Sequence, residues 1–145
     1  MADTPASAVA SSGDGTRLQC TVVTPERVIL DEMVNFVALP IIDGELGVMP
    51  GHMPIVGRLG YGELRTKLGQ TSSHWFIDGG FVQIRNNVVT VLTSRAIPRS
   101  ELNHQAAERD LQLAQSRPAA TLVEREEKDR ALARARGMVR LSSKG

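Results

Sequence analysis

The sequence lacks several features that common classes of protein require. It contains one cysteine, Cys20, so no disulfide can form within the chain and a metal site built from several thiolates is excluded. A single cysteine fits a reducing compartment. No apolar run approaches the roughly 20 residues of a membrane-spanning helix, and the N-terminus lacks the basic and apolar segments of a signal peptide. We therefore expect a soluble intracellular protein.

Aromatic residues and net charge are also scarce. One Trp, one Tyr and three Phe in 145 residues argue against an aromatic platform for stacking nucleic-acid bases. The formal net charge of +1 provides no strong attraction to nucleic acid or to anionic lipid. Apolar residues make up 41% of the chain, near the globular average, so the chain has enough apolar material for a core.

Sequence motifs for catalysis and phosphate binding are missing. The chain has no GxxxxGK[ST], GxGxxG, HExxH or GxSxG pattern. His52, His74 and His104 are far apart and fall in a predicted loop, a strand and a helix, so a metal site would need long-range folding. We expect His74 at the surface or an edge, His104 in solvent, and Cys20 as an inert core residue. The sequence predicts no catalytic residues and no metal ligands.

The first part of the chain has the pattern of a β-protein. Residues 1–16 are small and polar and predict a disordered tail. Beyond them, alternation of apolar and polar residues begins with Leu18, Cys20 and Val22, which is typical of a half-buried strand. Short strands with turn signals about every ten residues continue from there and predict a β-sandwich over residues 17–98.

Two turns within this region have clear sequence signals. Asn86 and Asn87 separate two apolar strands, and since Asn tolerates left-handed backbone, they fit a two-residue hairpin turn. Asp78, Gly79 and Gly80 predict a second turn.

Residues 99–145 have a different composition, rich in the helix formers Ala, Glu, Gln, Leu and Arg. Ser100 is the expected N-cap of a helix that runs to about Ser116. Thr121 and Glu124 fit a capping box that opens a second helix, ending near Leu141. The predicted fold is α+β by segments, with an N-terminal all-β sandwich followed by a C-terminal antiparallel helical hairpin.

The apolar stripes of the two predicted helices are thin and rich in alanine. An alanine methyl group contributes only about 0.8 kcal/mol when it is buried. The hairpin would then dock on the sandwich with only a few kcal/mol, so a docked and an undocked arrangement could both be populated.

The most distinctive segment of the chain is residues 44–54. It contains three glycines and two prolines, which predict a stiff, shaped loop, with apolar anchors between them. The segment carries Glu45, Met49 and His52, and stiff loops on a scaffold often carry function. Considered alone, the segment favours a solvated turn carboxylate at Glu45 and a loop-stabilising side chain at His52 over functional roles.

The spacing Gly-x-Leu-Gly-x-x-Pro-x-His-x-Pro in residues 44–54 resembles the epsilon-subunit family of rotary (F-type) ATP synthases. Residues 20–26, 60–64 and 79–92 add to the resemblance, which covers nearly all of residues 18–141. It implies a non-catalytic subunit of the central stalk that couples ring rotation to the catalytic head. Its partners would be the gamma subunit, the c subunits of the membrane ring, and the alpha and beta subunits. Its location would be peripheral, on the cytoplasmic face of the bacterial inner membrane.

The resemblance also implies roles for particular residues. Glu45, Met49 and His52 would contact the ring. The hairpin would be regulatory, permissive when folded on the sandwich and inhibitory to ATP hydrolysis when extended, with residues of its second helix near an acidic segment of the beta subunit. The candidates for that contact are Arg134, Arg136 and Arg140. The alternative for these arginines is a solvated basic face that complements the helix dipole.

Some members of that family bind ATP through an Ile/Leu-Asp-x-x-Arg-Ala pattern in the second helix together with later arginines. Here Glu126 and Glu127 stand where the apolar residue and the Asp would be. The remaining nucleotide-binding candidates are Arg130, Arg136 and Arg140, and we expect no bound cofactor.

Two other classes of function stay open at the level of sequence. A β-sandwich adaptor whose basic helix binds nucleic acid is the main alternative, although the net charge and the missing aromatic platform argue against it. The other is a small metal-dependent enzyme of barrel type that would use His52.

Overall fold

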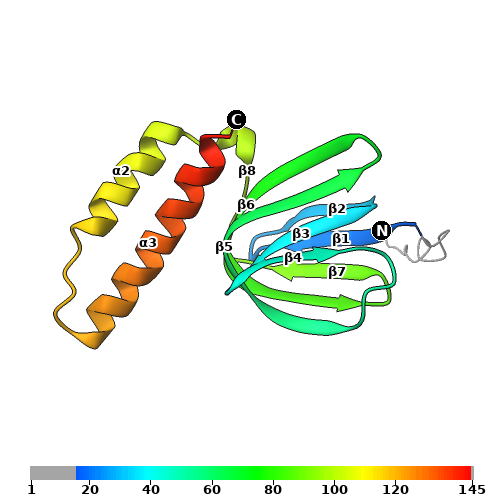
Figure 1. The fold of residues 1–145 in the computed structure, drawn as a ribbon, viewed down its shortest axis with the longest axis horizontal. Helices are drawn as coiled ribbons and strands as arrows, with labels where there is room; N and C mark the ends of the chain where they lie inside the picture. Colours follow the sequence, from blue (N-terminus) through cyan, green and yellow to red (C-terminus); the bar gives the residue numbers. More distant parts are fainter. Residues whose placement is uncertain (1–15, 145) are drawn as a thin grey trace.

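The computed structural model describes residues 16–144, so the tail predicted for residues 1–16 lies, except for Thr16, outside the described residues. These residues form a β-sheet domain followed by two antiparallel helices (Figure 1). The strands are β1 (Leu18–Val23), β2 (Val28–Val34), β3 (Phe36–Ile41), β4 (Gly44–Val48), β5 (Ile55–Leu68), β6 (Thr71–Arg85), β7 (Val88–Leu92) and β8 (Ala96–Pro98). The helices are the 3₁₀ turn η2 (Arg99–Glu101), α2 (His104–Gln115) and α3 (Leu122–Ser142).

The sheet is continuous and has the order β2-β1-β7-β6-β5-β3-β4, with β8 paired to β6. The long strands β5 and β6 form an antiparallel hairpin from which both layers of the sandwich extend. On one side β7 pairs with the C-terminal part of β6, and β1 pairs with β7 in parallel. On the other side β3 and β4 extend from β5. The predicted β-sandwich followed by a helical hairpin is confirmed.

The core of the sandwich is apolar, and β1 contributes to it as its alternation predicts, with every second residue buried. Cys20 is fully buried in this core, as expected. Burial raises the pKa of its thiol to about 12, with smaller contributions from the nearby Glu32 and Asp31. The thiol therefore stays protonated at neutral pH and is chemically inert.

One of the two predicted turns is confirmed and the other is wrong. Asn86 and Asn87 have φ of 52° and 62°, as a type I′ hairpin turn requires. Asp78, Gly79 and Gly80, by contrast, lie inside β6. A Cβ on Gly80 would lie 1.9 Å from the carbonyl oxygen of Leu92, so glycine is needed there for a close approach between strands.

The helix starts were predicted with mixed success. Thr121 and Glu124 form the expected capping box at the start of α3. The N-cap of α2 is Asn103, whose Oδ1 accepts a hydrogen bond from the backbone N–H of Ala106 at 2.9 Å. Ser100 lies instead within the 3₁₀ turn. Ser and Asn cap helices about equally well, so the sequence alone could not choose between these positions.

The hairpin is docked on the sandwich, with α3 against β5 and β6 and α2 on the far side of α3 (Figure 1). A second apolar cluster fills this interface, with Phe76 of β6 packed against Ala107, Met138 and Leu141 of the helices. The alanine-rich stripes are present, and the larger side chains of Phe76, Met138 and Leu141 add to the contact.

Candidate functional site

Glu45 lies in strand β4 rather than in a loop, because only residues 49–54 of the distinctive segment are outside regular structure. Its backbone pairs with Pro40 of β3, and its side chain is 55% exposed. The Nη1 atom of Arg65 lies 3.9 Å from its Oε2 atom, so the carboxylate is partly compensated and still accessible. An acceptor in this position can pair with a cationic or hydroxyl group of a partner.

Met49 and His52 lie in the loop that follows β4. Met49 is 63% exposed, and the backbone N–H of His52 donates to its carbonyl oxygen at 3.2 Å. The Nδ1 atom of His52 lies 2.8 Å from the carbonyl oxygen of Met53. A carbonyl only accepts, so Nδ1 carries a proton and Nε2 is the ring nitrogen left for a partner.

The loop is tied to the opposite hairpin turn. The N–H of Gly51 donates to Oδ1 of Asn87, which lies in the turn between β6 and β7, at 2.7 Å. This bond supports the prediction of a stiff loop. The neighbours of Glu45, however, are Arg65 and residues of α3, so the structure does not gather Glu45, Met49 and His52 into one cluster. They occupy opposite ends of β4.

The arginines of α3 also separate into two groups. Arg134 turns toward the sandwich, where its Nε donates to Oδ1 of Asp78 at 2.7 Å. Arg136 and Arg140 are exposed and line a cavity of about 560 Å³ that also contains Glu45. Arg130 is exposed and does not line this cavity. The three nucleotide-binding candidates are therefore not brought together around one cavity.

Sequence reasoning missed a charged cluster beside this cavity. Glu63 of β5 accepts from Nδ1 of His74 at 2.5 Å and pairs with Nζ of Lys144 at 3.2 Å. Burial raises the pKa of Glu63, but the hydrogen bonds and charges of His74 and Lys144 outweigh that effect and hold the pKa below its ordinary value. His74 was expected at the surface or an edge and is only partly exposed, while His104, expected in solvent, contacts Ser142 of α3 at 2.9 Å.

Asp78 was missed as well, because residues 78–80 were predicted as a turn. Its side chain is only 7% exposed and lies between Arg134 of α3 and Arg95, which follows β7. A carboxylate that directly follows the apolar run from Trp75 to Ile77 was the available signal, since buried carboxylates require partners.

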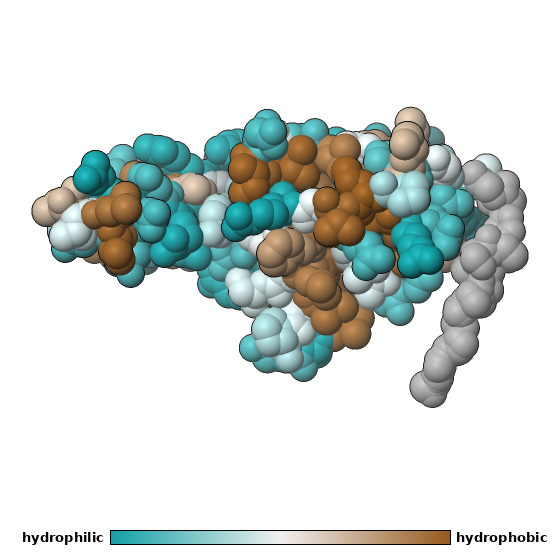
Figure 2. Space-filling model, turned by 90° about the horizontal axis from the view of Figure 1, so that it is seen from below, coloured by the Kyte–Doolittle hydropathy of each residue, from teal (hydrophilic) through white to brown (hydrophobic). Residues whose placement is uncertain are grey.

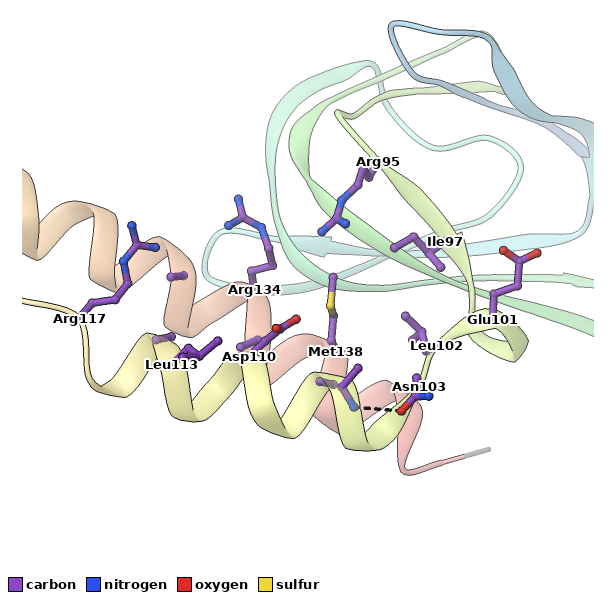
Figure 3. Close-up of a pocket in the computed structure, with 15 residues that line it drawn as sticks. Arg95, Ile97, Glu101, Leu102, Asn103, Asp110, Leu113, Arg117, Arg134 and Met138 are labelled. Carbon is purple, nitrogen blue, oxygen red and sulfur yellow. Dashed lines mark hydrogen bonds between the residues drawn. The ribbon is translucent and has the colours of Figure 1, made fainter.

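A cavity of about 590 Å³ lies where α2 and α3 meet the Arg95–Ile97 edge of the sandwich (Figure 3). Its walls carry apolar groups such as Ile97, Leu102 and Met138, and charged groups such as Arg95 and Arg134. In the part of the chain that the structure describes, no three His, Cys, Asp or Glu side chains are placed to hold a metal ion. Across the same residues, no helix has the length and apolar character needed to span a membrane.

The sandwich also has an exposed apolar face. Figure 2 shows apolar side chains gathered over the sandwich in the view from below. Phe81 and Leu92 are directly paired across β6 and β7, and they are 53% and 51% exposed. Val56, 75% exposed, lies on the neighbouring strand β5, and the guanidinium of Arg58 lies 6.0 Å from the centre of the Phe81 ring. Exposed apolar groups that cluster in this way mark contact surfaces.

The fold defines a two-part protein, a β-sandwich with a docked helical hairpin. A sequence model of the ATP synthase delta/epsilon chain β-sandwich domain matches residues 17–99. The ATP synthase epsilon chain of Rhodopirellula baltica is 48% identical over 125 residues, which cover 86% of this chain and 98% of the relative. That of Rubrobacter xylanophilus is 34% identical over 123 residues, covering 85% and 84%. The chain therefore belongs to the family of ATP synthase epsilon chains, as its sequence motifs predicted.

Solved structures agree with this assignment. A chain of the Euglena gracilis mitochondrial ATP synthase, in a cryo-EM structure of its OSCP/F1/c-ring part, superposes with a TM-score of 0.78 and 26% identity. The match covers 94% of this chain and 88% of the other. A chain of the central stalk and c-ring of the Tetrahymena thermophila enzyme has a TM-score of 0.69 at 14% identity, which supports the fold alone.

Proposed function

We propose that this chain is a non-catalytic subunit of the central stalk of a rotary, proton-translocating ATP synthase, where it couples ring rotation to the catalytic head. The observation that carries the proposal is the similarity to an ATP synthase epsilon chain over 98% of that relative, so that both the sandwich and the hairpin are matched. Its partners are the gamma subunit, the c subunits of the ring, and the alpha and beta subunits. Its location is peripheral, on the cytoplasmic face of the bacterial inner membrane.

The ring contact is assigned to Glu45, Met49 and His52. Glu45 offers an exposed acceptor, Met49 an exposed apolar group, and His52 a ring nitrogen that is not bound to its own loop. The bond from Gly51 to Asn87 holds the loop to the sandwich, which reduces the entropy lost on binding. Since these residues occupy both ends of β4, the contact runs along that strand.

The gamma subunit is assigned to the exposed apolar face around Val56, Phe81 and Leu92. A stable protein interface needs a desolvated apolar centre with a polar rim. The paired Phe81 and Leu92 provide such a centre, and Arg58 beside the Phe81 ring provides part of a rim.

The hairpin is assigned a regulatory role. Docked on the sandwich it permits ATP hydrolysis, and extended toward the catalytic head it hinders hydrolysis through Arg134, Arg136 and Arg140. Arg136 and Arg140 are exposed in the docked arrangement. No nucleotide site is assigned to Arg130, Arg136 and Arg140, because they do not line a common cavity.

The decisive experiment recovers the tagged chain from its own cells and identifies the proteins bound to it. The gamma, alpha, beta and c subunits are expected in stoichiometric amounts. Recovery without them, together with salt-dependent retention on DNA, would replace the stalk function with that of a nucleic-acid-binding adaptor.

A further inference from the structure

The carboxylate of Asp78 bonds to Arg95 of the sandwich and to Arg134 of the hairpin, and so links the two parts. Asp78 lies on β6, and its Oδ1 atom accepts from Nε of Arg134 at 2.7 Å. Its Oδ2 atom accepts from Nε of Arg95 at 3.3 Å and from Oγ of Ser94 at 3.4 Å. Arg95 and Ser94 belong to the sandwich, whereas Arg134 belongs to α3. The carboxylate is thus anchored on one side and reaches the hairpin on the other.

Arg134 is fixed by a second contact as well. Its guanidinium carbon lies 5.3 Å from the centre of the Tyr61 ring on β5, within the range of a cation–π interaction. Figure 3 shows Arg134 and Arg95 at the cavity between the hairpin and the sandwich, one on the helix and the other on the sandwich. Two different groups of the sandwich, a carboxylate and an aromatic ring, therefore hold this one side chain.

Among residues 16–144, a second ion pair joins the hairpin to the sandwich, and it is somewhat more exposed. Lys144 pairs with Glu63 at 3.2 Å, but its side chain is 50% exposed and it follows the end of α3. Exposed pairs of this kind contribute little to stability. The side chains of Asp78 and Arg134 are 7% and 37% exposed, against 12% and 50% for Glu63 and Lys144, and a hydrogen bond between charged groups contributes more where its partners are more buried. Arg134 also lies within α3, so loss of its bond would weaken the contact between the helix and the sheet.

We propose that the hydrogen bond from Arg134 to Asp78 keeps the hairpin docked, and we call this bond the latch. Asp78 thereby takes the place on Arg134 that an acidic side chain of an external partner would take. In the docked arrangement Arg136 and Arg140 are exposed, whereas Arg134 is bound to Asp78. An acidic segment can then engage all three arginines only after the bond to Asp78 breaks, so docking and full binding of that segment exclude each other. This second step rests on the regulatory function proposed above, whereas the latch itself does not.

The latch is tested on the isolated full-length chain by hydrogen exchange of the α3 amides. Helices of this kind depend on packing for their stability, so undocking accelerates their exchange. Asp78→Asn and Arg134→Gln should each raise the exchange rate about tenfold, because hydrogen bonds to charged groups contribute at least that factor. The double variant should exceed the single variants only slightly, since both remove the same bond.

The matched control is Arg136→Gln, which removes an exposed arginine two residues along the same helix and should leave α3 exchange unchanged. If Asp78→Asn also accelerates exchange in β1 and β7, the substitution has loosened the sandwich itself. The Arg134→Gln variant then tests the latch, because it leaves the bonds from Arg95 and Ser94 to Asp78 intact. Unchanged α3 exchange in Arg134→Gln, or fully additive effects in the double variant, would overturn the latch.

A second measurement separates the latch from the regulatory function. In the assembled complex, Asp78→Asn releases the hairpin and keeps all three arginines, so ATP hydrolysis should fall severalfold. Arg134→Gln also releases the hairpin but removes one contact to the head, so hydrolysis should fall less. Faster α3 exchange with equal hydrolysis in every variant would keep the latch and reject the regulatory function.

Discussion

Gly137 of α3 lies directly against the backbone of Tyr61 on β5. A Cβ at position 137 would be 2.8 Å from the carbonyl oxygen of Tyr61 and 3.2 Å from Cε1 of Phe76. Glycine in the middle of a helix normally costs about 1 kcal/mol relative to alanine. Its presence here is explained by the close approach of the helix to the sheet, which any side chain would prevent.

Gly137→Ala should therefore weaken docking, although the same change in an exposed helix would be stabilising. The added methyl group meets backbone and an aromatic ring, neither of which can move aside cheaply, so we expect a loss of about 1–3 kcal/mol in the docking free energy. Hydrogen exchange of α3 measures this loss. Arg136→Ala, which shortens an exposed side chain next to Gly137, serves as the control, and slower exchange in Gly137→Ala would contradict the close approach.

The ion pair of Glu63 predicts a pH dependence. The pKa of Glu63 is lowered in the folded chain by His74 and Lys144, so its ionised form stabilises the folded chain above the ordinary carboxyl pKa. That stabilisation is lost as pH falls through the lowered, folded-state value. Unfolding measured from about pH 6 to pH 3 should therefore show a stability difference between the wild type and Glu63→Gln that shrinks toward acid. A difference that grows toward acid would show that the sign is wrong.

Substitutions in the turn at residues 86–87 can test the stiffness of the loop at residues 49–54 without changing the backbone conformation of the turn. Both asparagines have positive φ, so glycine fits either position, but only Asn87 accepts the bond from Gly51. Asn87→Gly should accelerate amide exchange in residues 49–54, while Asn86→Gly should not. Equal exchange in the two variants would mean that the loop is held by its own glycines and prolines.

The proposed ring contact predicts that Glu45→Ala combined with His52→Ala weakens attachment to the ring. The side chain of Glu45 is exposed and His52 lies in the loop after β4, so the sandwich should keep its melting temperature. Co-purification of c subunits with the assembled complex measures attachment, and Glu26→Ala, an exposed glutamate between β1 and β2, is the control. Unchanged attachment in the double variant would reduce this segment to a structural role.

The proposed gamma contact predicts that Phe81→Ser lowers affinity for the gamma subunit by about 2 kcal/mol or more, as truncation of a central aromatic residue commonly does. Calorimetric titration of the purified subunits measures the change. Leu68→Ser, at the exposed tip of the β5–β6 hairpin, removes a comparable apolar group away from this face and should have no effect. Equal losses in both variants would point to a general effect on solubility.

The features that could be predicted from the sequence are those whose partners lie within a few residues. Thr121 and Glu124 cap α3 three residues apart, and Asn86 and Asn87 form their turn alone. The missed features depend on contacts across the chain. Asp78 meets Arg134 at a separation of 56 residues, and Glu63 meets Lys144 at 81. A local sequence pattern cannot identify pairs of residues this far apart in the chain.

The glycines show the same difference between local sequence signals and contacts across the chain. At Gly80 a Gly-Gly sequence predicted a turn, but the reason for glycine is the carbonyl group of Leu92 on the adjacent strand. The family motif predicted a ring contact through Glu45 and His52 without indicating that β4 would separate the two residues. Sequence therefore predicted the elements and the family well, whereas the arrangement of charges around the hairpin required the folded chain.

The parallel pairing of β1 with β7 bears on the order in which the chain folds. β1 leaves the ribosome well before β7, yet it needs residues 88–92 to complete its hydrogen bonding. Contacts so distant in sequence form late because the intervening chain must first be ordered. The hairpin is synthesised after β7, so Arg134 and Gly137 emerge when the strands that receive them are already available. Synthesis from the N-terminus thus favours a finished sandwich before the hairpin docks.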